Sequence, residues 1–172
     1  MVLRIFNCQL KIEFSFVLML SVALLTDNGT IAALLLFASL HEGGHLLLLL
    51  FFGGRPERIT LAFYGVGLRH SSLLKRWQEW LFLLGGIAVN AVFVAANIHR
   101  EVNGPLLLIN ALPIYPLDMG RALRLYVPYR FCRVVSCLFL LGMAVSAVLL
   151  KNVSLGLIAV YILAFSLKED LK

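Results

Sequence analysis

Long apolar stretches separated by short polar segments run along most of the chain. Six stretches can be marked: Ile12 to Leu25, Ile31 to Phe52, Trp77 to Ile98, Pro105 to Tyr126, Phe131 to Leu150 and Val153 to Leu167. The middle four match the roughly 20 residues that a helix needs to cross a bilayer. The first and last are short, so we expect them to be tilted, thinly capped or partly interfacial. The pattern predicts an all-α membrane protein with about six transmembrane helices.

The polar segment after the second stretch has a different pattern. Ile59 to Tyr64 is typical of a short strand, and Gly65 to Leu68 is typical of a glycine turn and a return. We expect a short membrane-associated β-hairpin-like loop here. Its edge could pair with an extended peptide, which makes Tyr64 a candidate substrate-binding residue. A loop that rests on the bilayer is an equally open alternative.

Composition supports a polytopic membrane protein of one domain, residues 1 to 172. The chain is 61% hydrophobic and 14% charged, and its mean hydropathy is +0.93, which a soluble domain of this size cannot bury. Cys8, Cys132 and Cys137 lack the spacing of a zinc site or a disulfide framework, so we expect free thiols. A secretory signal peptide over Phe14 to Leu25 is the less favoured interpretation, because no small-residue cleavage pattern follows.

The net charge of +6 indicates membrane topology and not nucleic-acid binding, because the positive side chains cluster in alternate polar segments. The opposite segments hold only Arg100 and Lys151. By the positive-inside rule, both termini and the Arg-rich loops are cytoplasmic. The side chains assigned to that side are Arg4, Lys11, Arg55, Arg58, Arg69, Lys75, Arg76, Arg124, Arg130, Arg133, Lys168 and Lys172.

The second apolar stretch contains the sequence His-Glu-x-x-His from His41 to His45. On a helix, two histidines four residues apart lie on one face and can hold one zinc ion. Glu42 lies about 100° around the helix from His41, so we expect it to point elsewhere and to act on water without binding the metal. The alternative is that both are structural histidines with their hydrogen bonds satisfied in the protein core. That alternative does not explain a carboxylate at membrane depth.

The fourth stretch holds a second informative run, from Asn110 to Arg121. Pro113 and Pro116 each remove a backbone donor, so we expect the helix to break around them and Asp118 to lie on the broken backbone. Counted from the span starts, Asp118 and the two histidines fall at similar depths. Two nitrogens and one carboxylate oxygen at one level predict a three-ligand catalytic zinc site with an open fourth position.

The third stretch, between these two runs, contains Gly85, Gly86 and Asn90. Glycines inside a membrane helix allow another helix to approach closely. Asn90 is a polar group in an apolar span and needs a partner. Glu79, near the cytoplasmic end, is expected to be solvated and has no assigned role.

These motifs, in this order and in apolar context, resemble those of the site-2 protease family of intramembrane zinc metalloproteases. The resemblance covers about residues 11 to 124, the expected catalytic core, and leaves accessory helices over about 131 to 167. In outline the chain is similar to the small six-span members, including the sporulation pro-sigma-factor processing protease. Ile87 and Met119 depart from the family pattern, in which proline and glycine are common at these positions. Neither departure removes a ligand.

The resemblance implies a zinc-dependent endopeptidase that cleaves membrane-spanning or membrane-associated proteins to release signals or transcription factors. It implies that His41, His45 and Asp118 bind zinc, that Glu42 is the general base and acid, and that Asn110 contacts the substrate. Asn90 joins Tyr64 and Asn110 as a candidate substrate-binding residue. We expect a bacterial cytoplasmic membrane as the location, and leave open a homo-oligomer or an inhibitory membrane partner.

Two other functions remain open. A divalent-metal transporter could use the same ligands transiently, although the chain has no internal repeat of the kind many transporters show. A catalytically idle relative could bind membrane partners. The Glu42 position favours a protease over both.

Overall fold

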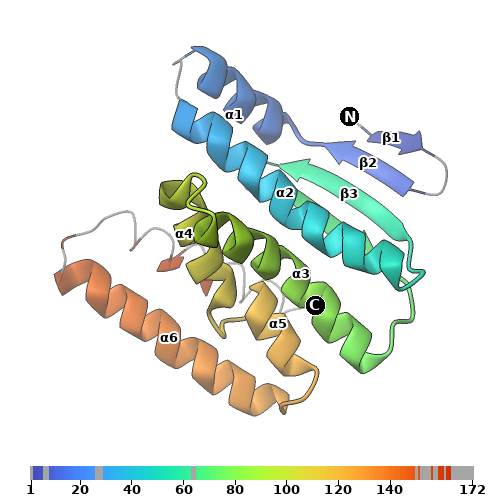
Figure 1. Ribbon diagram of the computed structural model, residues 1–172. Helices are drawn as coiled ribbons and strands as arrows, with labels where there is room; N and C mark the ends of the chain where they lie inside the picture. The colour runs from blue at the N-terminus through green and yellow to red at the C-terminus, as the bar shows by residue number, and fades with distance from the viewer. Residues whose placement is uncertain are drawn as a thin grey trace. The chain divides into compact units, whose positions relative to one another are not determined.

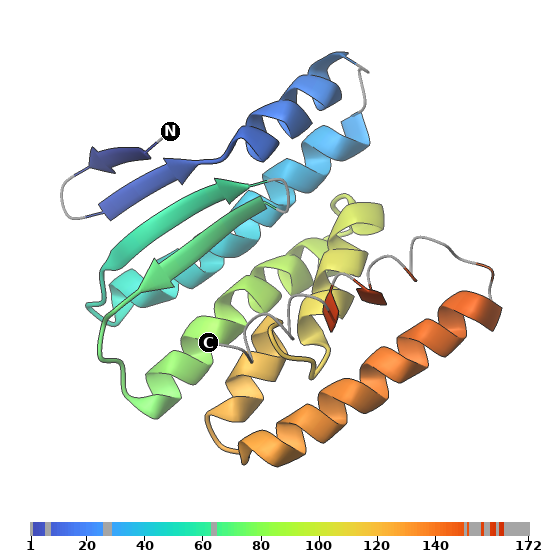
Figure 2. The same ribbon diagram turned by 180° about the vertical axis from the view of Figure 1, so that it is seen from behind.

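The computed structural model describes residues 2–5, 8–25, 29–62, 65–149, 151, 156, 159–160 and 162–163. It divides into two units, Met1–Leu108 and Ile109–Lys172, and each is described by itself. Figures 1 and 2 show the elements from opposite sides.

Three helices form most of the first unit: α1 (Phe14–Leu25), α2 (Gly29–Phe51) and α3 (Arg76–Ala95). Their residues are mainly Leu, Ala, Val and Phe, and none of the three contains proline. The 23 residues of α2 give a helix of about 35 Å, enough to cross a bilayer. In both views α2 and α3 lie side by side (Figures 1 and 2).

A four-stranded sheet completes the described part of this unit, in the order β1 (Val2–Ile5), β2 (Cys8–Ile12), β3 (Pro56–Ala62) and β4 (Gly65–His70). The outer pairs are antiparallel, and the central pair β2–β3 is parallel. The hairpin expected after the second apolar stretch is present as β3 and β4, and β4 also packs against α2. The expected turn at Gly65 is wrong, because Gly65 already pairs with Ala62 as the first residue of β4.

The strands β1 and β2 were not expected. Each is four or five residues long, and β2 pairs with a strand almost fifty residues later, Gln9 lying opposite Arg58. Register puts Leu10, Ile59 and Leu68 on one face and Gln9, Arg58 and Arg69 on the other. The stabilising partner is distant in sequence, so the local pattern alone does not reveal these strands.

Glycines bring α2 and α3 into backbone contact. A Cβ atom built on Gly44 would lie 2.5 Å from the carbonyl oxygen of Gly85, and one built on Gly85 would lie 2.7 Å from the carbonyl oxygen of Gly44. Neither position accepts a side chain unless the helices separate. The expectation that the glycines of the third stretch admit another helix is confirmed.

The second unit contains the expected break in the fourth apolar stretch. Helix α4 (Arg100–Ala111), which begins in the first unit, ends before the two prolines, and a short α5 (Asp118–Arg124) follows them. Within the break, Ile114 is fully buried and packs with Leu140 and Ile162. A Cβ atom on Gly120 would overlap the Ile114 carbonyl group, so this glycine is required by the close approach of α5 to the broken segment.

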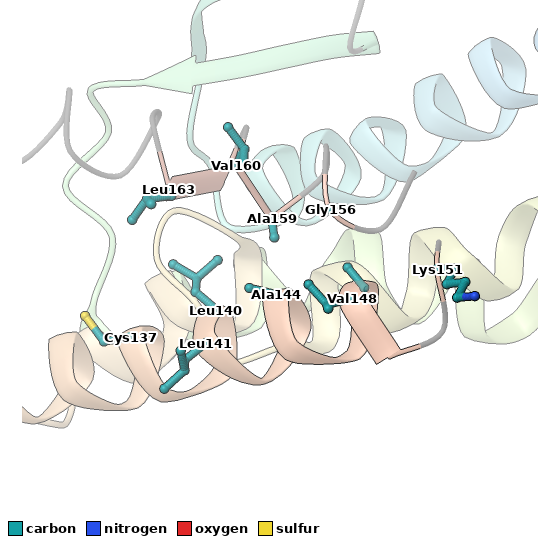
Figure 3. A pocket seen from close by; sticks show the side chains of 11 residues that line it. Cys137, Leu140, Leu141, Ala144, Val148, Lys151, Gly156, Ala159, Val160 and Leu163 are labelled. Carbon is teal, nitrogen blue, oxygen red and sulfur yellow. The ribbon is translucent and has the colours of Figure 1, made fainter. Parts of the chain in front are cut away.

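Helix α6 (Tyr129–Leu149) carries an apolar groove of about 770 Å³ on one side (Figure 3). Leu140, Ala144 and Val148 of α6 line it together with Ala159 and Leu163. Among the described residues that line it, only Cys137 and Lys151 carry polar side chains, so the groove offers little chemistry.

The prediction of six membrane spans is only partly supported. Within the described ranges, three helices are long and apolar enough to cross a membrane, α2, α3 and α6, and α1 is a shorter apolar helix. The expected span from Pro105 to Tyr126 is divided between α4 and α5, because prolines interrupt the helix. Most of the expected sixth span, Val153 to Leu167, lies outside the described residues.

The glycine contact predicts a sharp difference between two neighbouring positions of α2. Gly44→Ala should lower the unfolding free energy by about 1–3 kcal/mol, because the added methyl group pushes α3 away. Gly43→Ala should change it by no more than about 1 kcal/mol, since no atom of the described residues lies within 4 Å of a Cβ at Gly43. Thermal unfolding of both variants in the same detergent measures this. Equal melting temperatures would contradict the packing described above.

Candidate metal centre

The histidines of α2 lie together on the face that the helix turns toward α3. His41 and His45 are only 6% and 3% exposed. Their Nε2 atoms are 3.2 Å apart, and the rings meet edge to face at a centroid distance of 4.9 Å. The predicted pairing of the two rings on one helix face is therefore present.

Helix α3 forms the wall opposite the histidines through three residues spaced four apart, Phe82, Gly86 and Asn90. The carbonyl oxygen of Phe82 is 2.7 Å from His45 Nδ1, and the amide nitrogen of Asn90 is 3.0 Å from His41 Nδ1. Between them, a Cβ atom on Gly86 would lie 2.5 Å from His41 Nε2 and 2.6 Å from His45 Nε2. Residues at i, i+4 and i+8 share one helix face, so α3 contacts both rings at once.

The contact with Phe82 determines which nitrogen of His45 carries the proton. A carbonyl oxygen only accepts hydrogen bonds, so Nδ1 of His45 must be the donor. In the neutral ring, the lone pair of Nε2 is then directed toward His41. A histidine whose Nδ1–H is held by a backbone carbonyl is the usual form of a metal-binding histidine.

Glu42 is half-buried beside the rings. One of its carboxylate oxygens and one nitrogen from each histidine all lie within 4.8 Å of one another, so the three residues could hold a metal ion. The side chain reaches the same centre, because an offset of about 100° on the helix is within the reach of a glutamate. That it acts on water without binding the metal stays a prediction for Glu42. Its carboxylate can act on a water molecule at the same centre.

The donor set fits zinc on several observations. Two nitrogens that share one tetrahedral zinc ion at about 2.0–2.1 Å lie roughly 3.3–3.4 Å apart, close to the 3.2 Å between His41 Nε2 and His45 Nε2. Gly86 leaves open the space in front of both nitrogens. In addition, the buried Oδ1 of Asn90 has no hydrogen-bond partner among the described residues. A half-turn of the amide would let this oxygen accept a hydrogen bond from Nδ1–H of His41.

The contacts that His70 makes with Phe82 and Glu79 were not predicted from the sequence. The ring of His70, at the end of β4, packs on the Phe82 ring at 4.7 Å, and its Nε2 is 3.5 Å from Glu79 Oε1. Glu79, which was expected to be solvated, therefore has a partner in His70. In the sequence, the four-residue spacing of Phe82, Gly86 and Asn90 could have identified the face of α3 that contacts the histidines.

Three candidate residues belong to neither α2 nor α3: Asp118, Asn110 and Tyr64. Asp118 is the first residue of α5 and is 8% exposed. Asn110 is half-buried near the end of α4. Both lie in the second unit, and their grouping with the histidines stays a prediction. Tyr64 lies outside the described residues.

No protein-family model matches the chain, and no curated protein matches it significantly. Among solved structures, a site-2 protease from Methanocaldococcus jannaschii is similar, with a TM-score of 0.65 and 20% sequence identity. The similarity covers 100% of this chain and 95% of that one. The likeness extends along the entire sequence, so the chain has the fold of a site-2 protease. Its described part has helices long and apolar enough to cross a membrane and a His-Glu-His group that could hold a metal.

Proposed function

We propose that this protein is a zinc-dependent intramembrane endopeptidase of the site-2 protease family. The observation that carries the proposal is the centre on α2: two buried imidazole Nε2 atoms 3.2 Å apart with the carboxylate of Glu42 beside them. The similarity in fold to a site-2 protease supports the same assignment. A carboxylate and two histidines in an apolar helix are costly to retain without a function.

His41 and His45 would hold the metal together with Asp118 as the third ligand. Zinc in such a site supplies Lewis acidity, which activates water and polarises a peptide carbonyl group. The burial of Asp118 and its position after a helix break support its role, because a buried carboxylate requires a compensating cation or hydrogen bonds.

Glu42 would act as the general base and then the general acid. Its carboxylate accepts a proton from the attacking water and delivers that proton to the amine of the departing peptide. Asn110 would contact the peptide at the cleaved bond, and Tyr64 would contact it beside the sheet. His45 keeps its orientation throughout, because its Nδ1–H remains bonded to the carbonyl group of Phe82.

The substrate would be a membrane-spanning or membrane-associated protein, cut after its helix unwinds into an extended segment, because a helical amide is hydrogen-bonded internally. An edge strand offers such a segment a template. In the described sheet, β4 is an edge strand, and it packs against the helix that carries the metal centre. The Arg-rich segments favour cytoplasmic termini and regulated proteolysis on the cytoplasmic side of a bacterial membrane.

Removal of the Glu42 carboxylate tests the reaction. Glu42→Gln should reduce cleavage by at least about 10²-fold, because general acid–base catalysis is lost, while zinc remains bound. Fragments of membrane proteins are compared by quantitative mass spectrometry in cells with the native chain, Glu42→Gln or no copy, and zinc is measured on the purified proteins. Glu57→Gln, an exposed carboxylate of β3, is the control and should cleave normally. Retained zinc with an unchanged fragment pattern would instead favour metal transport or an idle scaffold.

The space in front of the histidines gives a prediction for metal binding alone. Gly86→Ala should weaken zinc binding at least about tenfold, because its methyl group would occupy the space beside both Nε2 atoms. Gly43→Ala, in the same His-Glu-x-x-His segment but facing open space, should bind zinc normally. Competition with a chromophoric chelator measures both affinities. Normal binding by Gly86→Ala would exclude the Nε2 atoms as ligands.

The proposed roles of Asp118 and Asn110 can be separated. Asp118→Asn should lower zinc affinity by about 10–100-fold, since one charged ligand is removed. Asn110→Leu should leave zinc affinity unchanged and lower only the cleavage rate. Chelator competition and cleavage of a substrate found in the fragment comparison measure the two effects. Unchanged zinc affinity in Asp118→Asn would remove Asp118 from the ligand set.

A further inference from the structure

Only one of the two polar atoms of the Asn90 side chain has a hydrogen-bond contact among the described residues. This side chain is 0% exposed, its Nδ2 atom lies 3.0 Å from His41 Nδ1, and its buried Oδ1 atom has no hydrogen-bond partner within the described part of the chain. A buried carbonyl oxygen without a hydrogen bond is destabilising. The two polar atoms of the amide can therefore affect which ring nitrogen of His41 carries the proton.

The hydrogen bonds at the centre form a chain with a defined direction. Asn90 Nδ2 donates to His41 Nδ1, so the proton of a neutral His41 ring lies on Nε2. That Nε2–H donates to His45 Nε2, and His45 Nδ1–H donates to Phe82 O. This orientation of the amide therefore favours the tautomer of His41 that carries its proton on Nε2, the side on which a metal would bind.

Metal binding requires the other tautomer of His41. In that tautomer the single proton of the neutral ring lies on Nδ1 instead of Nε2. Nδ1–H would then face the donor Nδ2 of Asn90, which is a repulsive contact. A half-turn of the Asn90 amide removes this conflict, because it brings the unpaired Oδ1 to the same place, and the two ends of an amide are nearly equal in shape.

We propose that Asn90 is a positioning residue that selects the tautomer of His41: its amide can donate to Nδ1, and after a half-turn it accepts from Nδ1–H, the tautomer in which Nε2 can bind a metal. The inference rests on the proposed function only in that His41 and His45 bind a metal. It differs from a substrate-binding role, since the amide is fully buried against the Nδ1 side of His41.

Two variants separate acceptance from donation. Asn90→Asp keeps an oxygen that accepts from His41 Nδ1–H, and it forms the carboxylate–histidine–metal arrangement common in zinc proteins. We expect its zinc affinity to equal or exceed that of the native protein. Asn90→Leu has a similar volume but no polar atom, and we expect its zinc affinity to fall about 10–100-fold.

A buried asparagine elsewhere in the unit is the matched control. Asn103 is also 0% exposed with an unpaired Oδ1, but its amide donates to the backbone carbonyls of Ile98 and His99. Asn103→Leu should lower the melting temperature and leave zinc affinity unchanged. This control separates loss of a buried amide in general from loss of the amide beside His41.

The experiment uses the full chain in detergent, with zinc affinity measured by chelator competition and the imidazole ¹⁵N resonances recorded without metal. We expect His41 to carry its proton on Nε2 in the native protein and on Nδ1 in Asn90→Asp. Native affinity in Asn90→Leu, or equal weakening in Asn90→Asp and Asn90→Leu, would overturn the proposal.

The nitrogen resonances test the proposal even if Asn90→Leu does not fold, because Asn90→Asp and the native protein suffice. An unchanged His41 tautomer in Asn90→Asp would overturn it. Failure of the proposed function looks different, since a native protein that binds zinc but cleaves nothing leaves the Asn90 result intact.

Discussion

The close approach of α2 and α3 is the constraint on which the centre depends. At Gly44 and Gly85 the two backbones touch without intervening side chains. Only at this separation can the carbonyl group of Phe82 and the amide of Asn90 reach the rings of His45 and His41 from the neighbouring helix. In a bilayer, where apolar side chains gain little by leaving lipid, such packing contributes much of the association between helices.

The chemistry of α2 could be predicted from the sequence because it is local. Two histidines four residues apart share a face on any helix, and proline interrupts a helix wherever it occurs in its interior, as between α4 and α5. The hairpin of β3 and β4 was predictable for the same reason, since alternation and glycine lie in one short segment.

Features that depend on distant partners could not be predicted. The pairing of β2 with β3 joins segments almost fifty residues apart. The partner of Asn90 proved to be His41, 49 residues away, and that of Glu79 proved to be His70. The sequence marked Asn90 as a polar group that needed a partner but not which one, because a single chain without its fold gives no information on which faces of two helices meet.

The parallel pairing of β2 and β3 has a consequence for biosynthesis. The strand β2 leaves the ribosome well before β3, and the chain between them contains α1 and α2. The partner of β2, the strand β3, is therefore made only after α2, the helix with the two histidines. The hairpin of β1 and β2 is therefore made before β3 exists, and closure of the sheet requires that α1 and α2 bring β3 back to β2.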